Sequence, residues 1–79
     1  MTAMIPEAVF AAHAPKLRDI LARLDAAQTV SDLDVPGLRL HPLKGDLSGF
    51  HAVIVSANWR VIFRFVDSDA FEVDYVDYH

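Results

Sequence analysis

The last three residues of the chain, Asp77-Tyr78-His79, place a carboxylate, a phenol and an imidazole side by side. Each of these groups can give up or accept a proton, and imidazole does so near neutral pH. Terminal residues are usually poorly ordered and dispensable. Three such groups in a row therefore raise the question of which other side chains lie beside them.

Two further candidates lie in the segment LHPLKGD, where His41 comes three residues before Lys44 in a loop restricted by proline and glycine. On its own this spacing is a weak signal, and an ordinary loop explains it about as well. His13 and His51 are interpreted as surface or packing residues.

Two kinds of catalytic site find no support in the spacing of residues. The acids of DSDAFEVD show neither EF-hand nor HExxH spacing, and the serines lack the glycine context of a nucleophile elbow. What remains is a set of Lys, His, Arg and Tyr side chains without a metal. Such a set suits cleavage of a phosphodiester, because cations stabilise charge on the phosphoryl oxygens while other groups move protons.

The periodicity of apolar residues predicts the elements that position these groups. Leu17, Ile20, Leu21 and Leu24 predict a helix over 15–27. Pro15 predicts a kink there, or a break from an earlier helical stretch. After Gly49 the period changes to two, which predicts strands over 50–56, 59–66 and 70–77, with a very short strand near 38–40. The expected fold is α+β: one or two N-terminal helices on one face of a small antiparallel sheet, in a single domain of residues 1–79.

Two turns fix the predicted register of the strands. The turn at Ala57-Asn58, where Asn can adopt a positive φ, pairs Ser56 with Trp59, and the turn at 67–69 pairs Val66 with Ala70. The predicted core face carries Phe50, Ala52, Ile54, Val61, Phe63, Phe65, Phe71, Val73 and Tyr75. The opposite face carries His51, Val53, Val55, Arg60, Ile62, Arg64, Glu72, Asp74, Val76 and Tyr78. Arg64 faces Glu72 in an exposed ion pair of small energetic weight. Arg60 lies opposite Val76, so the end of the chain lies beside an arginine.

Composition limits the class of protein. The 79 residues are 53% hydrophobic and include no cysteine, so neither a disulfide nor a thiolate metal site is possible. The chain carries a net charge of −4, which at first argues against a nucleic-acid partner. However, residues 39–64 hold four Lys or Arg and one acid, while 65–79 hold five acids. With no apolar span and no leader-like N-terminus, we expect a cytoplasmic protein without a membrane partner.

Three segments in chain order, LHPLKGD, ANWRVIFRF and VDYVDYH, resemble the HigB branch of the RelE-type toxins. These are the plasmid-maintenance killer proteins of bacterial type II toxin–antitoxin systems. The resemblance covers nearly the whole chain, from AAHAPKLRDILARLDAA onward. Family members usually begin with an additional strand and helix, which we expect to be missing here. An uncovered sheet edge of that kind favours pairing with another chain, including self-association.

The resemblance implies a ribosome-dependent mRNA endonuclease that uses the 2′-hydroxyl of the RNA and needs no metal or cofactor. It implies that Arg60 and Lys44 stabilise the phosphorane and that a histidine serves as general acid or base, without saying which. The phenol would stack on a base or bind the phosphate. The catalytic residues so implied are His41, Lys44, Arg60, Tyr78 and His79, with Asp77 as a possible addition.

The expected partners are a HigA-like helix-turn-helix antitoxin, the ribosome and mRNA, with operator DNA reached only through the antitoxin. The alternative is a shortened, catalytically weak homologue that acts as an antitoxin-binding or self-associating module. The intact motifs favour the enzyme. The acidic composition and the short N-terminus favour the module.

Overall fold

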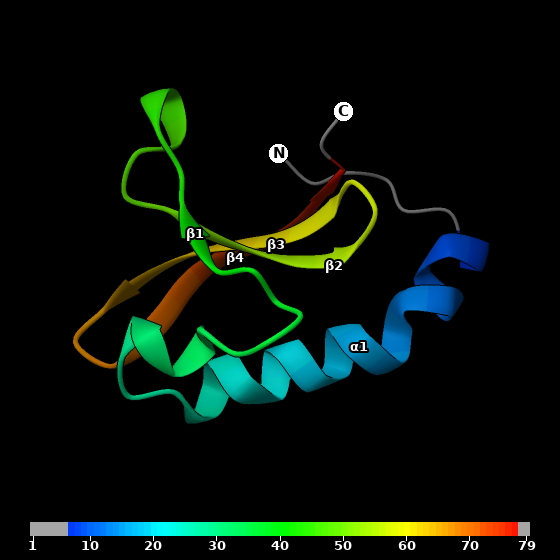
Figure 1. Cartoon of the computed structure of the whole chain (residues 1–79), viewed down its shortest axis with the longest axis horizontal. Helices are drawn as coiled ribbons and strands as arrows, with labels where there is room; N and C mark the ends of the chain where they lie inside the picture. Colours follow the sequence, from blue (N-terminus) through cyan, green and yellow to red (C-terminus); the bar gives the residue numbers. More distant parts are fainter. Residues whose placement is uncertain (1–6, 78–79) are drawn as a thin grey trace.

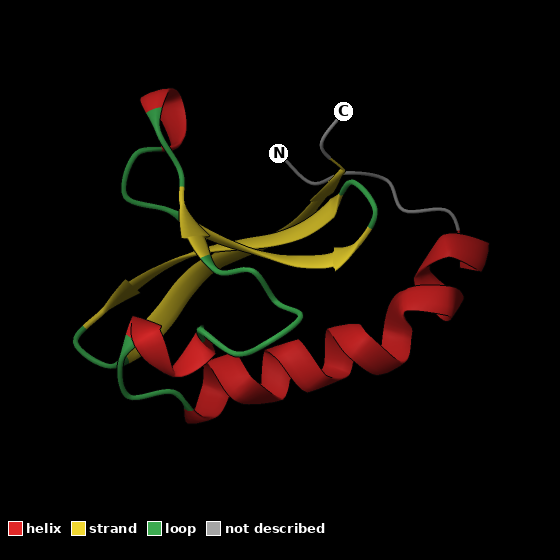
Figure 2. Ribbon diagram, in the orientation of Figure 1, coloured by secondary structure: helices red, strands yellow, loops and turns green. Residues whose placement is uncertain are grey.

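The computed structural model describes residues 7–77. In this part of the chain one helix and two 3₁₀ turns accompany four strands, in the order α1 (Glu7–Ala26), η1 (Val30–Leu33), β1 (His41–Pro42), η2 (Gly45–Leu47), β2 (His51–Ser56), β3 (Trp59–Val66) and β4 (Asp69–Asp77). The strands form one antiparallel sheet in sequence order, with α1 along one side (Figure 1). Figure 2 shows the separation of the helical layer from the sheet. The predicted α+β class is confirmed.

Helix α1 runs through Pro15, so of the two predicted alternatives, a kink or a break, the break is wrong. A proline inside a helix removes one backbone hydrogen bond and normally ends or bends the helix. Here the turn before Pro15 is held by tertiary contacts, because the His13 ring packs edge-on against Trp59 and Tyr75. Leu17, Ile20 and Leu24 of the predicted stripe are buried, whereas Leu21, which was predicted with them, is 43% exposed.

The turn between β3 and β4 is one residue shorter than predicted. Asp67 and Ser68 both have positive φ, as in a two-residue hairpin turn, and Val66 therefore pairs with Asp69 rather than with Ala70. An irregularity in the ladder beside Glu72, which has φ 51°, compensates for this shift. Beyond it the predicted pairing is recovered, and Arg60 lies opposite Val76.

A second irregularity reverses the predicted faces of β2. Ser56 pairs with Trp59 as expected, but the register shifts between Ile54 and Ser56. Val53 and Val55 consequently join the core cluster in place of the predicted Ala52 and Ile54, although Ala52 is still fully buried. His51 also lies on the core side, where its ring stacks on Phe63. In the turn, Ala57 has the positive φ that we expected of Asn58.

The core lies between α1 and the inner face of the sheet, and its largest fully buried side chains are Phe63, Ile20, Leu33, Val53 and Val61. Phe71 and Val73 were predicted to be buried but are 38% and 43% exposed. The predicted strand at 38–40 is instead β1, displaced to His41–Pro42. The Leu38 carbonyl still accepts a hydrogen bond of 2.7 Å from the Ile54 amide, so this segment follows β2 without forming a ladder.

Candidate active site

The face of the sheet turned away from α1, called the open face below, carries His41 and Arg60, whereas Asp77 pairs with Trp59 and lies on the core side. On β3, Val61 and Phe63 point into the core, so Arg60, Ile62 and Arg64 alternate onto the open face. Across the sheet, His41 pairs with Ala52, which in turn pairs with Ile62. At a strand spacing of about 4.8 Å and a rise of about 3.3 Å per residue, the Cα atoms of His41 and Arg60 are roughly 12 Å apart.

A backbone contact orients His41. Its Nδ1 lies 2.8 Å from the carbonyl oxygen of Arg39. A carbonyl oxygen only accepts hydrogen bonds, so Nδ1 must carry the proton. In the neutral ring Nε2 is then the nitrogen able to accept a proton from a substrate. The contact therefore selects the tautomer that a general base requires.

Lys44 lies on an arm, residues 43–50, that projects from the side of the sheet opposite α1 (Figure 1, green). A hydrogen bond of 2.9 Å from the Leu43 amide to the Phe50 carbonyl closes the base of the arm. Lys44 is exposed and immediately precedes η2. The structure therefore places this cation on the arm rather than in the sheet.

Arg60 lies at the end of the sheet where the described chain stops. Its Nη1 donates a hydrogen bond of 3.0 Å to the Ala57 carbonyl in the β2–β3 turn. The neighbouring Trp59 pairs with Asp77, which is exposed at the end of β4. The predicted proximity of Arg60 to the C-terminal segment is thus confirmed as far as Asp77. Tyr78 and His79 lie outside the described residues.

Three rings on the core side support this end of the sheet. The ring centroids of Trp59 and Tyr75 are 4.7 Å apart, and His13 Nδ1 lies 2.5 Å from the Tyr75 hydroxyl oxygen. Burial raises the pKa of Tyr75, and the nearby Asp77 carboxylate raises it further. The Tyr75 hydroxyl therefore stays protonated at neutral pH and connects β4 to α1.

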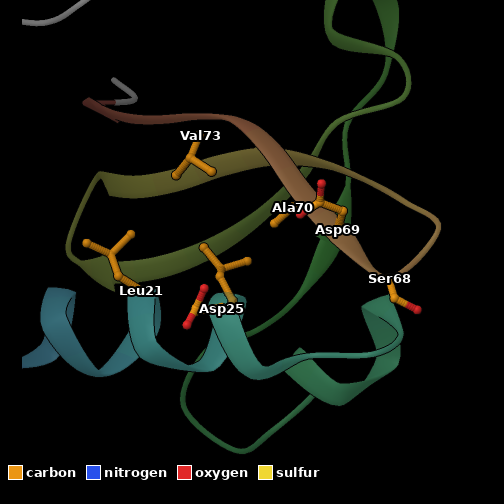
Figure 3. Close-up of a pocket in the computed structure, with 7 residues that line it drawn as sticks. Leu21, Asp25, Ser68, Asp69, Ala70 and Val73 are labelled. Atoms are coloured by element: carbon orange, nitrogen blue, oxygen red, sulfur yellow. The ribbon is translucent and has the colours of Figure 1, made fainter.

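A shallow pocket lies between α1 and β4, away from these candidates (Figure 3). Its lining combines apolar and polar side chains and consists of Leu21, Leu24, Asp25, Ser68, Asp69, Ala70 and Val73. None of the candidate catalytic residues that the structure describes lines this pocket. The candidate site is instead an exposed surface, which suits an extended polymer better than an enclosed small molecule.

Within residues 7–77, metal-binding clusters and membrane-spanning helices are both absent. No group of three or more His, Asp or Glu side chains there is arranged to hold a metal ion. No helix in the same range combines the length and the apolar character needed to cross a membrane.

One feature of the open face was not predictable from the pattern of apolar residues. The Arg64 guanidinium carbon lies 4.4 Å from the centroid of the Phe50 ring. Phe50 was assigned to the core because of its place in the alternating pattern, and the bulge in β2 could not be foreseen from that pattern. The predicted contact between Arg64 and Glu72 is present, at 3.0 Å.

Comparison with known proteins identifies relatives. Residues 5–79 match a family described as RelE-like toxin of type II toxin–antitoxin system HigB. The chain is 41% identical over 64 residues to Endoribonuclease HigB of Proteus vulgaris, a match that covers 81% of this chain and 70% of that protein. It is 44% identical over 57 residues to Toxin HigB-1 of Vibrio cholerae, covering 71% and 59%. The chain thus spans less than two thirds of the Vibrio protein.

Proposed function

Because the chain belongs to the HigB family of RelE-like toxins, we propose that it is an endoribonuclease that cleaves messenger RNA in the A site of translating ribosomes. The observation that carries this proposal is that His41 and Arg60 lie on one open face and that Arg60 lies beside β4, the strand that leads to Tyr78 and His79. The Proteus relative, named an endoribonuclease, supports the same reaction.

The proposed reaction is an intramolecular transesterification. A general base removes the proton from a ribose 2′-hydroxyl, whose oxygen attacks the adjacent phosphorus. The bond between phosphorus and the 5′-oxygen of the next nucleotide breaks, and a general acid protonates that oxygen. The products are a 2′,3′-cyclic phosphate and a 5′-hydroxyl, with no net gain or loss of protons or electrons.

The residues are assigned by their chemistry. Arg60, together with Lys44 from the arm, stabilises the negative charge that builds on the phosphoryl oxygens. His41 presents Nε2 as proton acceptor, which makes it our choice for the base. His79 then serves as the acid, and Tyr78 stacks on a base or binds the phosphate. Asp77 is a possible sixth member of this set.

We also propose that the toxin acts in the cytoplasm and is neutralised by a HigA-like helix-turn-helix antitoxin. A type II system pairs a toxin with a protein antitoxin, and the family description places this chain in such a system. Contact with operator DNA is assigned to the antitoxin, because the described chain offers only a short basic region between residues 39 and 64.

The second candidate function is a catalytically weak module that binds the antitoxin. One observation favours it: two of the exposed large apolar side chains, Leu21 and Val73, lie together at the pocket between α1 and β4. Exposed apolar clusters are typical of partner surfaces. A toxin also binds its antitoxin, so the two candidates differ only in whether mRNA is cleaved.

The deciding experiment is induced expression in a bacterial host, with growth measured and cleavage of translated mRNA mapped by primer extension. We expect growth arrest that co-expression of the antitoxin reverses. Arg60→Ala and Lys44→Ala should slow cleavage. Removal of Tyr78 and His79 should abolish it, since a positioned acid or base contributes roughly 10²–10⁴-fold in rate.

The melting temperature of each variant is the control. The truncation removes only residues beyond Tyr75, the last of the described side chains packed against the core, so it should melt close to the parent. A truncated protein that melts like the parent and still cleaves ribosome-bound mRNA would remove Tyr78 and His79 from the site. A parent protein that is folded but does not cleave mRNA on ribosomes would support the second candidate function, the antitoxin-binding module.

A further inference from the structure

The open face carries a second cationic site, four residues along β3 from Arg60. The Arg64 guanidinium carbon lies 4.4 Å from the centroid of the Phe50 ring, and Nε donates to the Glu72 carboxylate at 3.0 Å. The Arg64 side chain is nevertheless 38% exposed. An arginine is thus stacked on an aromatic ring and still accessible to a ligand.

The arm restricts Arg64 from a further direction. Gly49 has φ +95°, and a Cβ atom placed there would lie 3.1 Å from Arg64 Nη1. The backbone of the arm therefore approaches the guanidinium closely at a position that suits glycine. Glu72 occupies the irregular position in β4 with φ 51°. Ring, carboxylate and arm backbone together limit the orientations open to Arg64.

Stability gives only a weak reason for this arrangement, because exposed ion pairs contribute little to folding. RNA recognition gives a stronger one. Proteins bind unpaired bases by stacking them on aromatic rings or on guanidinium planes. The Glu72 carboxylate already engages Arg64 and would repel a phosphate, so an uncharged base is the better ligand.

The position is also suitable. Arg60 and Arg64 are on the same face of β3, roughly 13 Å apart at about 3.3 Å per residue. Phe71, the partner of Arg64 in the ladder, adds a second exposed ring beside it. An RNA strand lying along β3 with a phosphate at Arg60 would therefore bring a neighbouring base to Arg64.

We infer that the Arg64–Phe50 stack is a binding site for one unpaired base of an RNA strand bound along the open face. That this strand is the substrate rests on the proposed function. The stack then positions the RNA relative to the scissile phosphate, and it is distinct from the groups that move protons.

The test measures binding of an uncleavable probe, 2′-O-methyl hexaadenylate, by fluorescence anisotropy. The probe is compared with versions that carry an abasic residue at each position in turn. We expect one position at which loss of the base weakens binding to the parent by roughly 5- to 100-fold. Arg64→Lys keeps the charge but loses the flat stacking surface. It should bind the intact probe more weakly by a similar factor and should no longer distinguish the abasic version.

Phe50→Leu should reproduce this loss of discrimination. The matched control is Arg23→Lys, because Arg23 forms a similar exposed pair with Asp19 at 2.9 Å on α1, away from the open face. It should leave both affinities unchanged. Arg64→Lys should also keep the salt dependence of the parent, since the number of cations is the same. Melting temperatures identify any variant that fails to fold. If Phe50→Leu fails to fold, the result for Arg64→Lys alone tests the inference.

Equal affinity of the parent for intact and abasic probes overturns the inference, and so does a parent that binds neither. Unaltered discrimination in Arg64→Lys overturns it as well. If the parent cleaves ribosome-bound mRNA but shows no base dependence, only this inference fails. If base dependence is present and depends on Arg64 while the parent cleaves nothing, the proposed function fails and the base site stands.

Discussion

At the scale of single residues, His41 gains its candidate role from one hydrogen bond to the backbone. The bond from Nδ1 to the Arg39 carbonyl leaves Nε2 as the proton acceptor. We predict that His41→Asn lowers the rate of mRNA cleavage by roughly 10²–10⁴-fold, because an amide can donate to the carbonyl but cannot act as a base. The measurement is the cleavage rate on purified ribosomes, and an Asn variant that cleaves like the parent would show that His41 is structural.

Tyr75 carries a second prediction at this scale. Its pKa is raised in the folded protein, so the folded state holds the phenolic proton more tightly than the unfolded state does. The stability that this provides is fully present below the ordinary pKa of 10.0 and is lost as the pH rises through the higher folded value. We predict that the free energy of unfolding of the parent falls at strongly alkaline pH and that Tyr75→Phe reduces the fall.

Urea denaturation at a series of pH values measures this effect. Tyr78→Phe is the comparison, because it removes a phenol that follows Tyr75, the last of the described side chains packed on the core. If Tyr75→Phe and Tyr78→Phe have the same alkaline profile, the buried hydroxyl is not the source of the pH dependence.

At the scale of elements, the arm and the bulges determine what the sheet presents. Gly49 and Gly45 both have positive φ, at +95° and +68°. A Cβ at Gly45 meets open space, whereas one at Gly49 meets Arg64. Gly45→Ala and Gly49→Ala should each lower the free energy of unfolding by about 1 kcal/mol, because alanine is strained at these backbone angles. Gly49→Ala should lower it further, because its Cβ displaces the Arg64 guanidinium.

Chemical denaturation of both variants checks this prediction. The two variants should differ in free energy of unfolding when Arg64 is present, and they should have the same free energy of unfolding when each also carries Arg64→Ala. A difference that survives removal of Arg64 would have another origin.

At the scale of the whole molecule, the open face and its arm carry cations despite the net charge of −4. Cationic side chains lie on the open face and its arm, while Asp25 and Asp69 line the pocket between α1 and β4 (Figure 3). We predict that binding of the hexaadenylate probe weakens with salt, with a slope of log affinity against log salt of about −0.7 for each phosphate contact. Lys44→Ala and Arg60→Ala should each reduce that slope by about this amount. Arg18→Ala, which changes an exposed residue of α1, should not alter it.

The sequence by itself determined the features that depend on local backbone geometry. Helical and alternating periodicities follow from the repeat of the backbone, so the α+β class, the buried stripe of α1 and the full extent of β3 were predictable. The predicted pairing of Arg60 with Val76 is also present. It is present because the shorter β3–β4 turn and the irregularity beside Glu72 shift the register in opposite directions and cancel. The same pairing indicated which groups lie at the end of the sheet.

Only the tertiary structure decided which residues face the core and how the site is oriented. A bulge adds a single residue to a strand and so moves the side chains that follow it to the opposite face of the sheet. The position of a bulge depends on contacts with distant segments rather than on local spacing. For that reason Val53 and Val55 exchanged places with the predicted core residues of β2. The same exchange left Phe50 beneath Arg64. The tautomer of His41 likewise depends on where the Arg39 carbonyl points, which no periodicity specifies.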